Sequence, residues 1–471
     1  MRTLILTILL GFMAYGTVAA AADGELDPTF LTDVGFPGYG FYANPNAPAT
    51  NAKDTIGAIV ERPDHKIWAI GKMSTAGTDR LSLFLVQTDG VADVTFGVLG
   101  LRTVIQPCAG FEVADAKVDS QNRLLVAING CVDFMVYRFL PNGDLDASFA
   151  TGGVLSVAFN KGGDNEDQTR KLIIAPNGDV IIAGTVETAT SRSLGVARYT
   201  QAGQAAAEFG VAGKVVIAFE WEVWDHRGVN GLHQMADGRI LITGVILENP
   251  QGQVQKQQYV VRLLANGALD PSYGNSSAGI SKVNHKLALG VNASPDTMAS
   301  LMTNDGSIVQ IGAINSTNVN SGTDIFLMRW QSDGQLDTSI GLNGTRQYAL
   351  DYSGPNPPHP LFNYDSGRNI VQQDNGDYVI LALSKDEDFV LTTTMMRLKR
   401  NFDVDTSFGI GGKKRYDVQI GNGPSQGQSG SALMLQKGRI LFGGSVYTPP
   451  SGNIQMMMSV EHDEIFAHTF D

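Results

Sequence analysis

The chain has 471 residues and a formal net charge of −13, and its 34 Lys and Arg residues are spread along the sequence with no run longer than three. Without a basic stripe, nucleic acid and anionic membrane surfaces are poor candidates for partners. Its 54 glycines and 17% charged residues are typical of many short strands joined by tight turns rather than of helices.

The first residues predict export. After Met1-Arg2-Thr3 comes an apolar run and then small residues, which is the layout of a secretory signal peptide with cleavage after Ala20 or Ala22. The run is too short for a membrane span, and no comparable run follows it. We therefore predict a signal peptide at 1–22 and one exported, soluble domain at 23–471, in the periplasm or outside the cell.

One short motif recurs along the rest of the chain. It reads NGDLDASFATGG at 142–153, and we call the Asp of its LDxSF core the anchor. The anchor positions are Asp27, Asp93, Asp146, Ala206, Asp270, Asp337, Asp405 and Ala467. They are spaced by 53 to 68 residues, so eight anchors enclose seven repeats.

Each repeat predicts four strands. An alternating run such as GVLSVAF follows the anchor, then a hairpin such as RKLIIAPNGDVIIAG, then a strand that often ends in Arg, such as FMVYRFLPNG. The Asn-Gly, Asp-Gly and Lys-Gly turns are strong hairpin signals. The pattern predicts an all-β fold, a seven-bladed β-propeller with four antiparallel strands per blade. A β-solenoid is the rival, but its coils are usually shorter and lack antiparallel hairpins.

The repeat resembles the delta-60 repeat, which occurs in tandem in secreted bacterial proteins and is regarded as propeller-forming. The resemblance is carried by 176–184 with Arg198, by 236–244 with Arg262, and by 336–341, and it extends over 24–471. Ala206 and Ala467 depart from the anchor motif, which predicts looser joints there. The resemblance implies a propeller and brings no activity or catalytic residues with it.

We interpret the anchors Asp27, Asp93, Asp146, Asp270, Asp337 and Asp405 as structural joints. The Asp and the Ser of the motif can hydrogen-bond nearby backbone N–H groups. The alternative is a cation site at Asp144 and Asp146, which lacks the six or more oxygens of a calcium loop. Because there are eight anchors for seven repeats, we expect the strand near 38–43 to complete the blade formed near 431–435, 439–443 and 454–460.

The two rims of such a ring differ in sequence. The PNG turns and the anchor joints fall on one rim and are short, whereas long and dissimilar loops fall on the other. The long loops lie at 160–168, 220–230, 247–257, 284–296, 314–323 and 351–369. Varied loops on a uniform scaffold are where function usually resides. We call this side the long-loop rim and the other side the joint rim.

Aromatic and histidine residues in two long loops are the candidate binding residues. They are Trp221, Trp224, His226, Tyr352, His359 and Tyr364. Such residues can contact sugars or proteins, and the alternative is that they pack their own loops onto the rim. His226, His285 and His359 could meet over the axis as a metal site, but they lack close ligand spacing, so no metal and no cofactor is predicted.

The only two cysteines, Cys108 and Cys131, lie in one repeat and are both expected on the long-loop rim. In an exported chain this placement favours a disulfide over two reduced thiols.

Three functions remain open. The preferred one is a monomeric binding or scaffold propeller that holds a protein or glycan partner through the long-loop rim. The second is an enzyme, either a glycan hydrolase or lyase or a metal-dependent lactonase-like hydrolase, with candidate acids on the rim. Those acids are Asp164, Glu166, Asp167, Glu222, Asp225 and Asp365. No sialidase-type box or Gly-Xaa-Ser-Xaa-Gly turn supports the enzyme. The third is a structural or adhesive envelope component.

Overall fold

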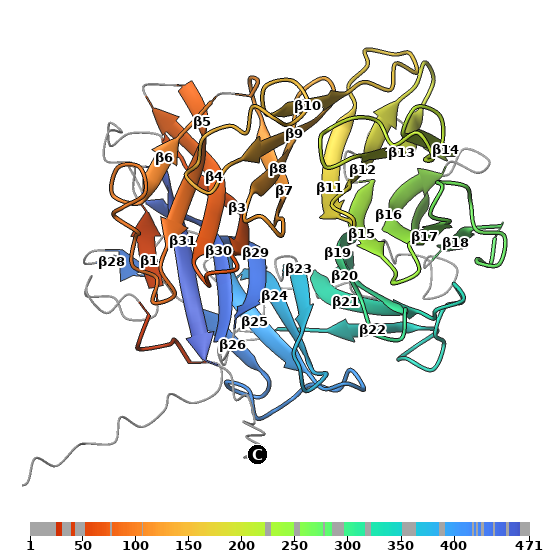
Figure 1. Cartoon of the computed structure of the whole chain (residues 1–471). Coiled ribbons are helices and arrows are strands. Elements are labelled where there is room, and N and C mark those ends of the chain that lie inside the picture. Colours follow the sequence, from red (N-terminus) through yellow and green to blue (C-terminus); the bar gives the residue numbers. More distant parts are fainter. Residues whose placement is uncertain are drawn as a thin grey trace, which may run out of the picture.

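Seven blades of four antiparallel strands form a ring around a central axis, as predicted, and one of these sheets gains a short fifth strand that pairs in parallel (Figure 1). The structure is a computed structural model. It describes residues 25–30, 39–42, 52–75, 78–105, 107–221, 228–248, 255–276, 278–284, 296–315, 322–350, 364–385, 391–416, 419–420, 423–424, 428–436, 439–448 and 452–461. These residues form strands and turns and no helix, so none of them belongs to a helix long and apolar enough to cross a membrane.

In blades 1 to 6 the strands run from the axis outward in chain order. Blade 1 is β3 (Thr55–Glu61), β4 (Ile67–Thr75), β5 (Thr78–Val86) and β6 (Leu101–Thr103). Blade 2 is β7 (Glu112–Val118), β8 (Leu124–Asn129), β9 (Phe134–Phe139) and β10 (Val154–Val157). Blade 3 is β11 (Gln168–Ile174), β12 (Val180–Glu187), β13 (Arg192–Tyr199) and β14 (Lys214–Trp221). Blade 4 is β15 (Val229–Gln234), β16 (Ile240–Glu248), β17 (Gln255–Leu263) and β18 (Ile280–Val283).

The second half of the ring has the same plan. Blade 5 is β19 (Asp296–Met302), β20 (Ile308–Asn315), β21 (Thr323–Trp330) and β22 (Thr345–Tyr348). Blade 6 is β23 (Asp365–Gln372), β24 (Tyr378–Lys385), β25 (Leu391–Leu398) and β26 (Lys413–Tyr416). Blade 7 is β29 (Gln428–Gln436), β30 (Arg439–Thr448), β31 (Gly452–Glu461) and β1 (Tyr39–Tyr42). The short strands β2 (Ala52–Lys53), β27 (Gln419–Ile420) and β28 (Gly423–Pro424) complete the set.

The ring closes through the N-terminal strand, which confirms the predicted exchange. β1 pairs antiparallel with β31, with Tyr39 opposite Met458 and Tyr42 opposite Gln455. The anchor Asp27 therefore serves blade 7, where its N–H donates to the carbonyl of Ser459 at 3.0 Å. One blade is thus assembled from both ends of the described chain.

The hydrophobic core lies between blades. In one cluster Phe134 of blade 2 packs with Leu172 and Ile182 of blade 3, and all three are fully buried. Each blade buries both of its faces against the neighbouring blades. The apolar side chains of a strand are therefore removed from water only when the ring is assembled.

The anchor Asp is the centre of a buried ion-paired joint. Asp146 Oδ1 accepts hydrogen bonds from the N–H and the Oγ of Ser148, and its Oδ2 accepts one from Arg138 Nε at 2.8 Å. The Arg138 guanidinium also donates to the carbonyl of Gln201 in blade 3 and lies 4.3 Å from the ring centre of Phe149. The joint therefore ties the outer part of one blade to the next.

The same pair recurs with the same spacing of eight residues. Arg262 Nε donates to Asp270 Oδ2 at 2.8 Å, and Arg397 Nε donates to Asp405 Oδ2 at 2.6 Å. Arg262 also donates to the carbonyl of Ser332 in the next blade at 2.8 Å. The sequence showed the recurrent Arg without indicating its partner.

Where a repeat lacks one member of the pair, a neighbouring charge replaces it. In blade 3 the anchor is Ala206, and Arg198 Nη2 pairs instead with Asp179 at 2.9 Å. In blade 1 Lys66 Nζ pairs with the anchor Asp93 at 2.6 Å. Ala206 is nevertheless buried, and its N–H donates to Arg198 O at 3.0 Å, just as the N–H of four other anchors donates to the carbonyl of the Arg eight residues earlier.

The glycine of the NG turn is required by this packing. Gly143 has a φ of 81°, and a Cβ there would lie 2.8 Å from the ring of Phe96, the aromatic residue of the preceding joint. Only glycine combines that backbone conformation with that close approach.

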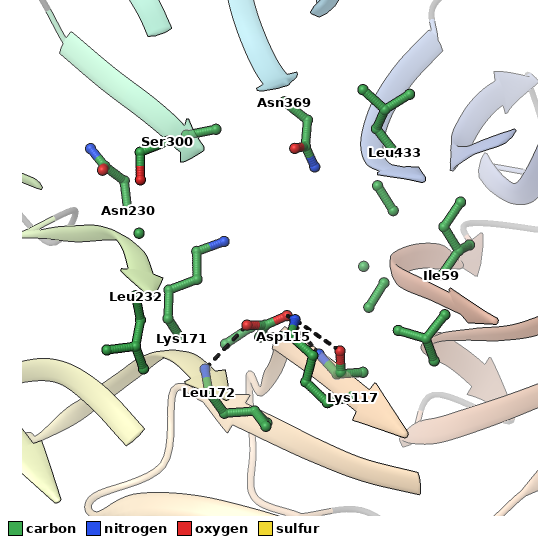
Figure 2. Close-up of a pocket in the computed structure, with 18 residues that line it drawn as sticks. Ile59, Asp115, Lys117, Lys171, Leu172, Asn230, Leu232, Ser300, Asn369 and Leu433 are labelled. Carbon is green, nitrogen blue, oxygen red and sulfur yellow. Dashed lines mark hydrogen bonds and ion pairs between the residues drawn. The ribbon is translucent and has the colours of Figure 1, made fainter. Parts of the chain in front are cut away.

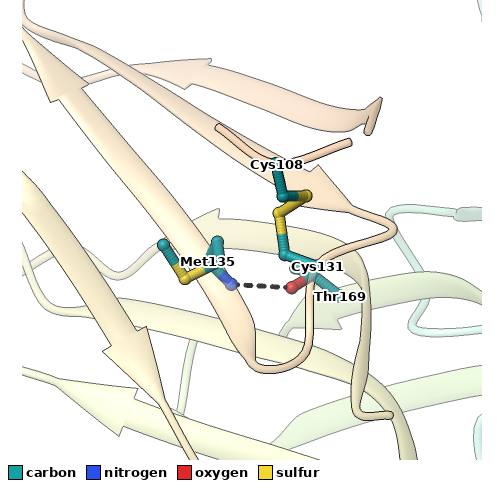
Figure 3. Close-up of a disulfide and its surroundings, with 4 residues drawn as sticks. All are labelled: Cys108, Cys131, Met135 and Thr169. Carbon is teal, nitrogen blue, oxygen red and sulfur yellow. Dashed lines mark hydrogen bonds between the residues drawn. A yellow bond between two sulfur atoms is a disulfide. The ribbon is translucent and has the colours of Figure 1, made fainter. Parts of the chain in front are cut away.

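Cys108 and Cys131 form a disulfide, as predicted (Figure 3). It links the connection before β7 to the hairpin between β8 and β9, on the long-loop rim. Beside it, Met135 N–H donates to Thr169 Oγ1 of blade 3 at 3.0 Å.

We predict that Asp270→Asn lowers the free energy of unfolding by about 2 kcal/mol at pH 7, because it leaves the buried Arg262 without its charged partner. The hydrogen bonds from Ser272 and Arg262 outweigh burial and lower the pKa of Asp270 to about 2. The stabilisation by the ionised carboxylate is present above pH 4 and disappears as the pH falls toward 2. Urea unfolding across this range tests it, and an undiminished difference at pH 2 would contradict it.

Removing the disulfide by Cys108→Ser with Cys131→Ser should lower the free energy of unfolding by about 3 kcal/mol, because the bond closes a loop of sequence separation 23. The measurement is urea unfolding with and without reductant. The wild type should fall to the level of the double variant under reductant, and the variant should not respond. Equal stability of both proteins without reductant would refute a stabilising role.

Candidate functional site

The innermost strand of every blade carries a β-bulge. The pairing of each with its neighbour shifts by one residue near the end that faces the long-loop rim. The shifts fall between Ile56 and Ala58, Val113 and Asp115, Thr169 and Lys171, Val229 and Gly231, Thr297 and Ala299, Gly367 and Asn369, and Gly430 and Ala432. Bulges re-aim side chains and often lie beside functional sites. Here they determine what faces the axis.

A cavity of about 260 Å³ lies on the axis and is lined by residues from all seven inner strands (Figure 2). Its charged lining consists of Asp115, Lys117 and Lys171, and its polar lining includes Asn230, Ser300 and Asn369. The remaining lining residues are glycine or aliphatic. We call this space the axial cavity.

Asp115 is engaged on both carboxylate oxygens. Oδ1 accepts from Lys117 Nζ at 2.7 Å and from Ala116 N–H at 2.9 Å. Oδ2 accepts from Leu172 N–H of the next blade at 3.1 Å. Burial alone would raise the pKa of Asp115, but Lys117, Lys171 and the backbone donor outweigh burial and lower that pKa. Asp115 is therefore ionised, and its charge is already compensated.

Lys171 points into the axial cavity from β11 (Figure 2). Among the described residues, none lies within hydrogen-bond or ion-pair distance of its ammonium group. Burial lowers its pKa, Asp115 opposes that effect, and the positive charges of Lys117 and Arg170 lower the pKa further. The balance of charge around Lys171 is therefore positive.

A chain of hydrogen bonds borders the cavity between blades 4 and 5. His233 Nε2 lies 2.9 Å from Ser300 Oγ, and Ser300 Oγ lies 2.8 Å from Thr243 Oγ1. Thr243 Oγ1 donates to Asn230 Oδ1 at 2.7 Å. Burial, then the charges of Lys171 and Lys117, lower the pKa of His233 to about 4. The imidazole is therefore neutral at pH 7.

The axial cluster was not found from the sequence. The polar and charged residues that line the axial cavity belong to different repeats and share no motif. Which strand position faces the axis is determined by the β-bulges, and these could not be located from the sequence. The available signal was the presence of charged residues inside two of the expected strands, EVADAKV at 112–118 and the pair Arg170-Lys171.

Most of the predicted rim residues lie outside the described part of the chain. These are Trp224, His226, Tyr352 and His359, and the side chain of Trp221, whose backbone belongs to β14. Tyr364 is described and is held at the start of blade 6. Its hydroxyl accepts from Arg368 Nη2 at 3.1 Å, and Lys385 Nζ lies 5.6 Å from its ring centre.

Two predicted rim acids are parts of blade-to-blade contacts. Asp167 Oδ2 accepts from Phe159 N–H of blade 2 at 3.1 Å, and Asp365 Oδ2 accepts from Leu350 N–H of blade 5 at 2.8 Å. Glu166 lies 3.8 Å from Arg192. Of the other three, Asp164 is described, whereas Glu222 and Asp225 are not. Within the described residues, no three His, Cys, Asp or Glu side chains are grouped as a metal ion would require.

A third acid occupies the same place in blade 1. Asp54 Oδ1 accepts from Ser74 N–H at 2.8 Å, just as Asp167 Oδ1 accepts from Glu187 N–H twenty residues downstream. Burial raises the pKa of Asp54 to about 6, and Asp79 contributes to the rise. This carboxyl, like Asp167, begins the inner strand of its blade and fixes the end of the second strand.

The fold and the repeat define the class: an all-β propeller of seven blades, assembled from one propeller-forming repeat. A family model described as "Domain of unknown function (DUF5122) beta-propeller" matches residues 236–273 and 303–339, which include the joints at Asp270 and Asp337. No curated protein matches the chain in sequence.

Several solved structures are similar to the chain at low sequence identity. The polysaccharide lyase Uly1 is 11% identical with a TM-score of 0.50, over 90% of this chain and 92% of its own. A virginiamycin B lyase from Staphylococcus aureus is 12% identical with a TM-score of 0.43, over 89% and 98%. Drosophila Plexin A is 11% identical with a TM-score of 0.38, over 90% and 86%. At 11% identity, the likeness to the polysaccharide lyase concerns the fold alone.

We predict a stability that falls with rising pH because of Asp54. Its folded pKa of about 6 exceeds the ordinary value of 3.8, so the folded state holds a proton that the unfolded state has lost, and stability decreases as the pH rises from about 4 to 6. Asp54→Asn keeps the acceptor for Ser74 and should be more stable than the wild type by about 2 kcal/mol at pH 7.5 and by little at pH 4.

Urea unfolding at both pH values measures this difference. The control is Asp374→Asn, which removes an exposed turn carboxylate and should not change the pH dependence. A wild type and an Asp54→Asn variant with the same pH dependence would refute the assignment.

Proposed function

We propose that the protein is an exported delta-60 repeat propeller that binds a protein or glycan ligand through its long-loop rim. A disulfide suits an oxidising compartment outside the cytoplasm. The leader-like sequence at 1–22 supports the same destination. The proposal concerns binding, and the enzyme reading gains no support from Asp167, whose two oxygens hold backbone N–H groups of neighbouring strands.

The observation that carries the proposal is the contrast between the two rims. On the joint rim the polar side chains of the repeat motif are used between blades: Asp146 holds Arg138, and Arg138 holds the backbone of Gln201. Asp270 and Arg262 repeat the arrangement with Ser332. That rim is committed to structure, so we assign ligand contact to the opposite rim, where loop lengths and sequences vary.

The loops of the long-loop rim have the composition of a binding surface. One loop has the sequence EWEVWDHRG at 220–228, and another has DYSGPNPPHPLFNYDSG at 351–367. Tryptophan and tyrosine supply large contact areas with a polar edge and stack on sugar rings or fill protein pockets. The disulfide links two connections of the same rim at blade 2.

The expected result is that Trp221→Ala with Trp224→Ala weakens ligand binding at least tenfold, because each ring would supply buried contact area. Binding would be measured on a glycan array and by quantitative capture from the envelope fraction of the native host. The matched control is Val211→Ala with Ile410→Ala, which removes apolar side chains that are 82% exposed in the joints. A ligand lost by the control variant and retained by the tryptophan variant would contradict the proposal.

A further inference from the structure

We propose that the axial cavity is a binding site for a small oxyanion, a carboxylate, sulfate or phosphate group, either free or carried by a saccharide. The lining of this cavity comes from the innermost strands of the blades, so the proposal does not rest on the rim proposal.

The net charge of the residues that line the cavity is positive, so the cavity favours an anion over a cation. Lys117 and Lys171 line the cavity with one carboxylate, Asp115. Both oxygens of Asp115 are already occupied by Lys117 and by two backbone N–H groups. Arg170 adds positive charge close enough to lower the pKa of Lys171. The chain as a whole has a net charge of −13, which already supports solubility. The positive charge around the cavity therefore needs another explanation.

Two donors point into the open part of the cavity from opposite sides. Figure 2 shows the Lys171 ammonium directed inward from blade 3 and the Asn369 amide directed inward from blade 6. Asn369 Oδ1 accepts from Ile370 N–H at 2.9 Å, which fixes the orientation of the amide and turns its NH₂ group toward the cavity. Among the described residues no acceptor is assigned to that NH₂ group or to the Lys171 ammonium. An ammonium and an amide that converge are donors for an oxyanion.

The positive potential has an energetic consequence that a bound anion would reverse. Burial is the largest cause of the lowered pKa values of His233 (about 4) and Lys171, and the positive potential lowers both further. A cation without a partner in a partly dehydrated site destabilises the fold. An anion between Lys171 and Asn369 would compensate that charge. Because the site is preformed, little of the binding free energy would be lost in ordering it.

The size of the cavity restricts the ligand. Its volume of about 260 Å³ lies below the range of about 300 to 1,000 Å³ that holds a whole drug-sized molecule. A free inorganic anion, a monosaccharide acid or the charged group of a longer chain fits this space, whereas an entire oligosaccharide does not.

The test is calorimetric titration of the full mature chain with sodium sulfate, sodium glucuronate and a sulfated tetrasaccharide, at constant ionic strength and pH 7. We expect one saturable site for at least one of these anions. Lys171→Met keeps the length of the side chain and removes its charge, and it should weaken that binding at least tenfold. Asn369→Asp places a carboxylate in the site and should also abolish binding.

The control is Lys399→Met, which removes the same charge from an exposed turn and should bind as the wild type does. NMR titration of His233 provides a second readout, because a bound anion should raise its pKa in the wild type and not in Lys171→Met. The proposal is overturned if none of the three anions binds saturably, or if Lys171→Met binds them as tightly as the control.

The two sources of the anion are separated by the same titrations. A tetrasaccharide that binds more than tenfold tighter than sulfate, in a manner that depends on Lys171, identifies a charged group on a saccharide. Equal affinities identify a free anion. Trp221→Ala with Trp224→Ala should leave sulfate binding unchanged, so failure of the rim proposal and failure of the axial site are distinguishable.

Discussion

The pairing of a buried carboxylate with an arginine eight residues earlier holds the outer edge of the ring together. In the second blade Asp146 fixes its own turn through Ser148 and at the same time orients Arg138. The guanidinium then reaches the backbone of the next blade. A fold whose core lies between blades needs such a connection, because no single blade buries its own apolar faces. The hydrogen-bonded charge pair supplies specificity of orientation in addition to stability.

This constraint accounts for the division of labour between the rims. The joint rim repeats because its side chains, turn glycines and aromatic residues must fit one geometry seven times, as Gly143 against Phe96 illustrates. The residues of the long-loop rim and of the axis do not have to fit this repeated joint geometry, so they can differ from blade to blade. At the axis the bulges bring Asp115, Lys171 and Asn369 of three different blades to one cavity.

Much of the fold could be predicted because its signals are local. Hairpin turns, alternating strands and the anchor spacing indicated seven blades, and the surplus anchor indicated closure through 38–43. The pairing of Cys108 with Cys131 followed from their placement in one repeat. The partner of the recurrent arginine was not predicted, since the pair joins a strand to the turn beyond it and only the folded geometry brings them together. For the same reason the sequence did not indicate that Asp179 takes the place of the carboxylate that is missing at Ala206.

The axial site could not be derived from the sequence, because Asp115, Lys171 and Asn369 are separated by 56 and 198 residues and share no motif. Two of the predicted rim acids, Asp167 and Asp365, accept hydrogen bonds from the backbone of the preceding blade. A carboxylate at the start of an inner strand is a structural feature of several repeats, which only the hydrogen bonds reveal.

The most direct test of the ion-paired joint is to convert blade 3 to the arrangement of the others. Asp179→Lys should lower the urea midpoint of the full chain, because it removes the partner of Arg198 and places a like charge beside it. Adding Ala206→Asp should restore the midpoint, since the backbone at Ala206 already matches the other anchors. Restoration would establish that position and charge alone define the joint. A double variant as unstable as Asp179→Lys would contradict that account.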